Sequence, residues 1–171
     1  WAALAEISSL GIVRTSIATL ISSYGILFTT ILLVQPIFDT FFERANSFPL
    51  WFALIAVLSA SASFVNAMLV MRLGMRRLIS TALHIQIAWS FLMLLLLQGG
   101  MISGTLGFGL FVFWIFGLFF QTGMTLGNLT ALAMEPLGHI AGTGASVISA
   151  LATLGSVAIA TIIGQFFDGT P

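Results

Sequence analysis

The sequence predicts an all-α membrane protein with five transmembrane helices. Only 6% of the 171 residues are charged, whereas ordinary globular chains carry roughly 25%. Hydrophobic residues make up 59% of the chain, and its mean hydropathy is +1.15. So few charges cannot cover a folded core in water, but lipid is a solvent that such a surface fits.

Charges and turn residues divide the chain into apolar stretches of about 20 residues or more, the length that crosses a bilayer as a helix. The five expected spans are residues 16–38, 50–71, 78–97, 105–133 and 141–167. Residues 1–15 are expected to form a cytoplasmic lead-in, and residues 168–171 a truncated extracytoplasmic end. Together, residues 16–167 would form one transmembrane helical domain.

The third and fourth spans come from one stretch, residues 78–134, that has no acid, lysine or arginine. As a single helix it would be about 85 Å long at 1.5 Å per residue, which is far thicker than a bilayer. The stretch therefore has to turn. Residues 98–104, Gln-Gly-Gly-Met-Ile-Ser-Gly, form its only turn-like cluster.

The arginines predict the orientation of the chain. The N-terminal flank, the second loop and the fourth loop share one side, which carries Arg14, Arg72, Arg76 and Arg77, while the other side has only Arg44. The positive-inside rule then places the N-terminus in the cytoplasm. The chain has no lysine and no basic cluster, so nucleic acid is not an expected partner.

The composition offers little from which to build a catalytic or metal site. There is no cysteine, and the two histidines and five acids are scattered. No HExxH, Walker A or Rossmann glycine motif is present. We therefore expect no enzymatic activity, no catalytic residue, no metal and no cofactor. His84 is a candidate proton carrier, but a hydrogen-bonded helix contact near the cytoplasmic end is the favoured interpretation.

Small residues four apart predict that these helices pack tightly against one another or against absent partners, because such residues let backbones approach inside lipid. The rows are Ala152/Ser156/Ala160/Gly164, Ala141/Ala145/Ser149 and Ser59/Ser63/Ala67, together with the GxxxG motif Gly123–Gly127. Plain helix packing explains each row without any further function.

One loop resembles a motif of the major facilitator superfamily. Met71-Arg-Leu-Gly-Met-Arg-Arg77 is similar to the R-x-G-R-R loop of that superfamily. The matching positions are Arg72, Gly74, Arg76 and Arg77. This copy has one extra residue before the arginine pair, and Met71 stands where the family often has an acid.

A second segment, residues 128–146, resembles the junction between helices ten and eleven in the drug-efflux branch of the superfamily, the bicyclomycin-resistance type. There a Pro-x-Gly turn is followed by Ala-Gly-Thr or Ala-Gly-Ser and small residues. The residues that carry this match are Glu135, Pro136, Gly138 and Gly142.

The resemblance implies a fragment of a twelve-helix drug:proton antiporter. The five spans would be helices seven to eleven of a major-facilitator-type bundle, an incomplete second half. The resemblance further implies proton-coupled export of small amphipathic molecules or drugs by alternating access, in the inner membrane of a bacterium. The partners would be the bilayer, the substrate, protons and the missing N-terminal half, where the proton-carrying acid commonly lies.

The resemblance also implies where a substrate would bind. In the family the seventh, eighth, tenth and eleventh helices contribute to the cavity and the ninth is peripheral. By helix position, the candidate cavity residues are Tyr24, Phe28, Gln35, Phe116 and Gln121. The same argument lowers the expectation for His84 and Gln86, which lie on the third span. The alternative function is a non-transporting multi-pass membrane subunit or scaffold, complete at five spans.

Overall fold

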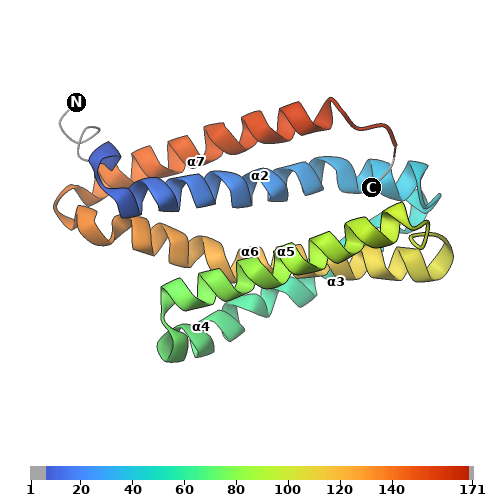
Figure 1. The fold of residues 1–171 in the computed structure, drawn as a ribbon, viewed down its shortest axis with the longest axis horizontal. Coiled ribbons are helices and arrows are strands. Elements are labelled where there is room, and N and C mark those ends of the chain that lie inside the picture. Colours follow the sequence, from blue (N-terminus) through green and yellow to red (C-terminus); the bar gives the residue numbers. More distant parts are fainter. Residues whose placement is uncertain (1–6, 170–171) are drawn as a thin grey trace.

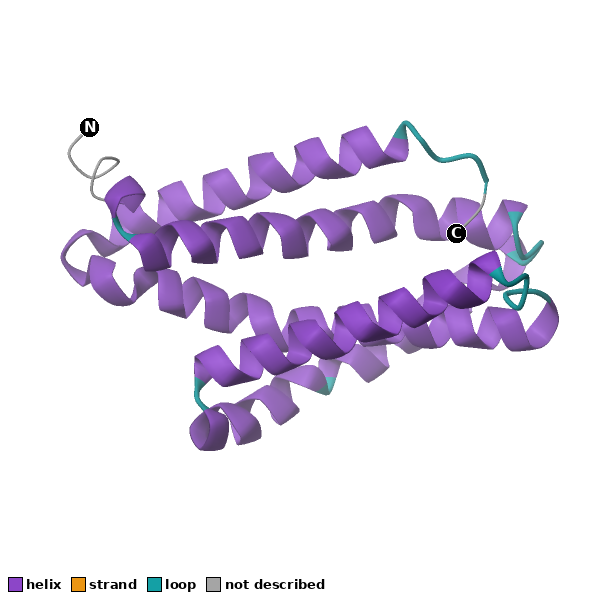
Figure 2. Cartoon of the chain, in the orientation of Figure 1, coloured by secondary structure: helices purple, strands orange, loops and turns teal. Residues whose placement is uncertain are grey.

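The computed structural model describes residues 7–169, which form helices and short turns without any strand (Figure 2). The long helices are α2 (Gly11–Thr40), α3 (Phe48–Ala60), α4 (Ala62–Leu73), α5 (Met75–Gln98), α6 (Gly104–Met134) and α7 (Ala141–Gly164). Two short 3-10 helices, η1 (Ala45–Ser47) and η2 (Glu135–Ile140), lie in turns. The predicted all-α class is confirmed for this part of the chain.

Four helical runs of the described chain are long and apolar enough to cross a membrane. The last run, Gly104–Gly164, has 61 residues and would be about 90 Å long if it were straight. It is not straight, because η2 reverses the chain between α6 and α7 (Figure 1). The four runs therefore contain five long helical segments, which is consistent with a multi-pass membrane protein.

Most helix ends lie within three residues of the expected spans, and the start of α2 differs by more. α2 begins at Gly11 instead of Ser16, so part of the expected lead-in is helical. The only charge there is Arg14, whose exposed side chain does not interrupt a helix. α7 ends at Gly164, before the expected Phe167. The expectations for residues 1–6 and 170–171 lie outside the described residues.

The second expected span, residues 50–71, is two helices, because α3 ends and α4 begins at Ser61. The Ser61 hydroxyl donates to the carbonyl of Leu58 at 2.6 Å, and the Ser61 N–H donates to the same oxygen at 3.1 Å. A serine that bonds back to its own helix in this way bends the helix. Sequence pattern alone did not predict this break.

α6 is the central helix of the bundle, since it packs against α2, α3, α4 and α5. α7 packs along α2 on the opposite side from α3 and α4 (Figure 1). Ala152, Ser156 and Ala160 of α7 are buried in that contact, and the Ser156 hydroxyl donates to the carbonyl of Ile21 at 3.3 Å. Close packing by this predicted row is confirmed.

Two of the other predicted rows have members that are not packed within the described bundle. Ala141 and Ser149 of the second α7 row are exposed, as are Ser63 and Ala67 on α4. Their small side chains face outward, away from the helices of this chain. Within residues 7–169 these four positions therefore do not pack against another helix, and their packing against absent partners stays a prediction.

Candidate functional site

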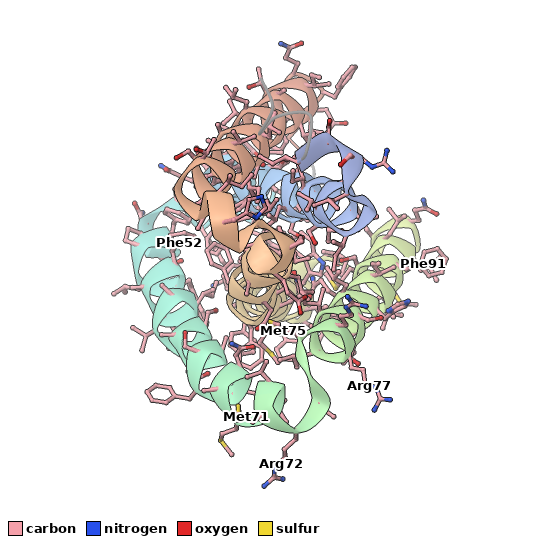
Figure 3. The ribbon with its side chains drawn as sticks, turned by 90° about the vertical axis from the view of Figure 1, so that its left-hand side faces the viewer. Phe52, Met71, Arg72, Met75, Arg77 and Phe91 are labelled. Carbon is pink, nitrogen blue, oxygen red and sulfur yellow. The ribbon has the colours of Figure 1, made fainter. Side chains whose placement is uncertain are left out.

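The arginine loop is the turn between α4 and α5. Gly74 ends α4 with a φ of +77°, a left-handed value that glycine adopts without strain. Arg72, Arg76 and Arg77 are exposed around it, and Arg72 and Arg77 point away from the bundle (Figure 3). The loop thus presents three cations at one end of the molecule.

The Glu-Pro turn lies at the same end as the arginine loop (Figure 1). Glu135 is exposed and begins η2, with Pro136 in its first turn. The proline lacks an N–H, so it fits the first turn of a helix and ends α6 cleanly. Gly138 and Gly142 are exposed, and a Cβ added at either would meet nothing within 4 Å. The turn is held instead by Leu137, which is fully buried.

A cavity of about 400 Å³ lies between α4, α5 and α6. We call it the α4–α6 cavity. It is lined by Leu69, Leu73, Leu78, Thr81, Ala82, Ile85, Gln86, Trp89, Phe113, Phe116, Gly117, Phe120, Gln121 and Met124. Small-ligand sites have volumes of roughly 300–1,000 Å³ and mostly apolar and aromatic walls with a few polar groups. The size and lining of this cavity match that description.

Two of the five predicted cavity residues line the α4–α6 cavity. Phe116 is half-buried and Gln121 is buried. The side-chain amide of Gln121 donates to the hydroxyl of Thr125 at 2.8 Å, and that hydroxyl donates to the main-chain carbonyl of Gln121 at 3.0 Å. These bonds within α6 hold the Gln121 side chain in place, so its orientation at the cavity wall is fixed.

The other three predicted residues, on α2, do not reach the α4–α6 cavity. Tyr24 and Phe28 contact each other with ring centroids 5.7 Å apart, and Tyr24 packs against a core that includes Leu20 and Leu129. Gln35 is exposed. The structure therefore separates the five residues into two groups on different sides of α6.

Sequence reasoning missed Gln86 and Trp89, which line the α4–α6 cavity from α5. The signal was present, because Ala82, Gln86 and Trp89 are three or four apart and share one helix face. The expectation for Gln86 was lowered on the ground that the ninth helix of the family is peripheral. In this bundle, α5 supplies one wall of the cavity.

His84 lies on a different face of α5, in a groove of about 580 Å³ that also includes Arg76, Thr15 and Thr19. Its Nδ1 is 2.6 Å from the carbonyl oxygen of Ser80. A carbonyl only accepts, so this nitrogen carries the proton in that contact. The bond within the helix agrees with the favoured interpretation of His84 as a hydrogen-bonded helix residue.

α4 and α6 are also joined by a polar bond. The Asn128 amide donates to the side-chain oxygen of Asn66 at 2.6 Å and to the carbonyl of Met124 at 2.7 Å. Asn128 is buried. Within the described residues, no group of three His, Cys, Asp or Glu side chains is close enough to hold a metal ion.

Comparison with known proteins adds no family. No family model, no curated protein and no solved structure matches this chain. The resemblance to the major facilitator superfamily therefore rests on the two segments of sequence described above.

Proposed function

We propose that this chain is part of a secondary active transporter that exports small amphipathic molecules, with protons as the coupling ion, by alternating access. The α4–α6 cavity carries the proposal. It is a ligand-sized space between membrane-spanning helices, and it is lined by Phe116 and Gln121, two residues that the resemblance selects. Polar side chains inside membrane helices mark substrate pathways in many transporters.

The positions of the two motifs support the same proposal. The arginine loop and the Glu135–Ile140 turn lie at one end of the bundle (Figure 1). In the proposed transporter this end is cytoplasmic, because it also carries Arg14, while Arg44 lies at the other end. A second helical bundle, contributed by the rest of the transporter, completes the path across the membrane in this proposal.

The acids of the described residues do not lie in the middle of any helix. Asp39 is in the last turn of α2, Glu43 follows it, and Glu135 begins η2. Asp168 follows α7. The proposal therefore assigns the proton-carrying acid to the other half of the transporter, which agrees with what the resemblance implies.

Efflux from cells tests the proposal. Cells that lack their main drug pumps and express the complete open reading frame containing this chain should retain several-fold less of a fluorescent amphiphile. A proton ionophore should abolish the difference. No proton-dependent efflux for any member of a broad panel of compounds would refute export. DNA on both sides of the coding region is the companion test, since seven further apolar spans, six before and one after, are expected.

Charge reversal in the arginine loop is the matched mutational test. Reversing Arg72, Arg76 and Arg77 to glutamate should weaken cytoplasmic retention of the loop and impair efflux. The control is Arg44→Glu, which changes an arginine at the other end and should retain both. Wild-type topology and efflux in the triple variant would mean that these arginines are passive surface charges.

A second candidate function is a non-transporting membrane subunit. The outward-facing small residues Ser63 and Ala67 on α4, and Ala141 and Ser149 on α7, favour it. Such residues let a partner helix approach closely in lipid. This candidate expects no efflux, and it expects loss of partner association when these residues are replaced by leucine.

A further inference from the structure

A groove of about 580 Å³ separates α2 from α5 at the end of the bundle that carries the arginine loop. We call it the α2–α5 groove. Both helices pack on α6 but make almost no contact with each other, so Leu129 and Leu132 of α6 form the floor of the groove. The polar residues of its walls are Thr15, Ser16 and Thr19 on α2 and Arg76, Ser80 and His84 on α5. No acid lies in the lining.

Arg76 brings an unpaired positive charge to this groove. Its neighbours in the loop, Arg72 and Arg77, point away from the bundle (Figure 3), whereas Arg76 lines the groove. Arg76 forms no ion pair among residues 7–169. An anion in the groove would therefore meet a cation that no carboxylate of these residues neutralises.

Ser16 places a hydroxyl without a partner in the same groove. The residue is only 5% exposed, and its hydroxyl forms no hydrogen bond among residues 7–169. Its oxygen is not fully covered, in contrast to the unpaired oxygen of Ser59. The flanking Thr15 and Thr19 differ, because their hydroxyls donate to carbonyls of α2 at 3.0 and 2.8 Å. A buried hydroxyl without a partner costs free energy, so a ligand that accepts a hydrogen bond from Ser16 would stabilise the protein.

Ser80 provides a second hydroxyl, one helical turn after Arg76 on the same face of α5. Its oxygen is 3.3 Å from Nδ1 of His84. That nitrogen carries a proton, because it donates to the main-chain carbonyl of Ser80 at 2.6 Å. The Ser80 hydroxyl therefore cannot donate to it, and the hydroxyl hydrogen is available to a ligand.

These donors and the apolar part of the groove select the class of ligand. A phosphodiester carries a negative charge and several acceptor oxygens, which suit an arginine and two hydroxyls. Farther along the groove, Leu83, Ile87 and Leu129 present apolar side chains. A free phosphate ion would leave that part empty, whereas a phospholipid places its phosphate on the donors and an acyl chain along the apolar wall. Basic pockets between membrane helices bind the head groups of anionic lipids.

We propose that the α2–α5 groove binds an anionic phospholipid of the phosphatidylglycerol type. The phosphate accepts hydrogen bonds from Arg76, Ser16 and Ser80, and an acyl chain lies along Leu83 and Ile87. The lipid site does not depend on the proposed function, because lipid binding and efflux are measured separately.

Photolabelling of the full chain in phosphatidylcholine nanodiscs locates the lipid. Phosphatidylglycerol that carries a diazirine in one acyl chain attaches to neighbouring side chains on irradiation, and peptide mass spectrometry identifies them. Labelling of Leu83 or Ile87 should saturate as this lipid is titrated. Phosphatidylcholine with the same diazirine should label these residues several-fold less, because its head group has no net charge.

Arg76→Gln tests the charge, and Arg77→Gln is the matched control. Both variants remove one arginine from the same loop, but Arg77 points away from the bundle (Figure 3). Arg76→Gln should weaken labelling of the groove about fivefold, the effect of one cationic side chain on an anionic lipid, and Arg77→Gln should label almost as the wild type does. Ser16→Ala should weaken labelling roughly threefold to tenfold, as the loss of one hydrogen bond predicts.

Three results would overturn the proposal. Equal loss of labelling in Arg76→Gln and Arg77→Gln would mean that the arginines act only through the charge of the surface. Displacement of the lipid by millimolar inorganic phosphate would mean that the groove takes a free anion. Disulfide bonds between copies that carry Leu83→Cys, without labelling of the groove, would mean that a helix of a second copy fills it.

Discussion

Replacement of Gly155 by alanine should destabilise the bundle through the contact between α2 and α7. A Cβ at Gly155 would lie 2.9, 2.9 and 3.0 Å from three side-chain atoms of Ile21. Carbon atoms pack at about 3.5–4.0 Å, so all three contacts are too short. One of the atoms is Cγ2, on the branched carbon, so a rotation of the Ile21 side chain cannot relieve all three.

The matched control is Gly127→Ala in α6. A Cβ at Gly127 would meet nothing within 4 Å, yet both glycines lie inside helices. Both substitutions gain the same helix propensity, roughly 0.5–1 kcal/mol. The difference between them therefore isolates the steric cost, which for an overpacked site is roughly 1–3 kcal/mol.

Unfolding of the purified chain by sodium dodecyl sulfate in mixed micelles, followed by circular dichroism, measures the free energy of unfolding. Gly155→Ala should be less stable than Gly127→Ala by that amount. Ile21→Ala removes the three clashing atoms, so the double variant should cost less than the sum of the two single changes. If Gly155→Ala and Gly127→Ala unfold within about 0.5 kcal/mol of each other, α2 and α7 do not approach at this point.

Two further predictions concern individual contacts. A Cβ at Gly25 would lie 3.3 Å from the Cβ of Ile159, near the roughly 3.5–4.5 Å of a disulfide. The natural sequence has no cysteine, so Gly25→Cys with Ile159→Cys should form one disulfide on oxidation, detected by peptide mass spectrometry. The control pair is Ile26→Cys with Ile159→Cys, in which Ile26 is an exposed neighbour of Gly25, and it should stay reduced. Cross-linking of both pairs would contradict the α2–α7 register. Alanine at Asn66 and Asn128, singly and together, should reveal a coupling energy of about 0.6–2 kcal/mol in the same unfolding assay, and additive effects would show that the 2.6 Å bond does not stabilise the bundle.

The number of long helical segments could be predicted from the sequence because the length of each segment depends on one strong physical constraint. A span needs about 20 residues that carry no charge, and the described chain has its charges within a turn or so of helix ends or in the turns between helices. The long uncharged stretch, residues 78–134, had to turn on length alone, and it turns at residues 99–103, between α5 and α6. Helix ends were harder to predict. α2, for example, begins before Arg14 and continues past it, and the sequence pattern does not show that an exposed arginine is tolerated there.

The break at Ser61 could not be predicted because serine is compatible with a continuous membrane helix. What distinguishes Ser61 is that its hydroxyl donates to the carbonyl of Leu58. Whether a serine hydroxyl forms this bond depends on the residues that surround the helix. The next residue, Ala62, is fully buried, and its Cβ is 2.9 Å from the position that a Cβ on Gly123 would take. Tertiary contact therefore decides the local conformation.

All five candidate cavity residues were selected by the place of their helix in the family's bundle, a criterion that does not say which face of the helix meets a cavity. Phe116 and Gln121 lie five positions apart on α6, yet both reach the α4–α6 cavity because α4 and α5 cover a broad part of that helix. Tyr24, Phe28 and Gln35 were selected in the same way, and the structure places them away from this cavity. Knowledge of a helix's place in a bundle does not say which of its faces meets which neighbour.

The GxxxG motif of Gly123 and Gly127 lies where α4 contacts α6, next to the α4–α6 cavity. Among residues 7–169 only its first glycine packs against another helix, since a Cβ at Gly123 would meet Ala62 whereas a Cβ at Gly127 would meet nothing within 4 Å. The motif therefore acts as a single point of close approach, placed where the second helical run breaks. Met124, the next residue, already lines the cavity, as does Phe120 one turn earlier. α4 approaches α6 closely at Gly123 and is also joined to it by the bond between Asn66 and Asn128. Large side chains such as Leu69 and Phe120 lie beside these contacts, and the α4–α6 cavity is the space between them.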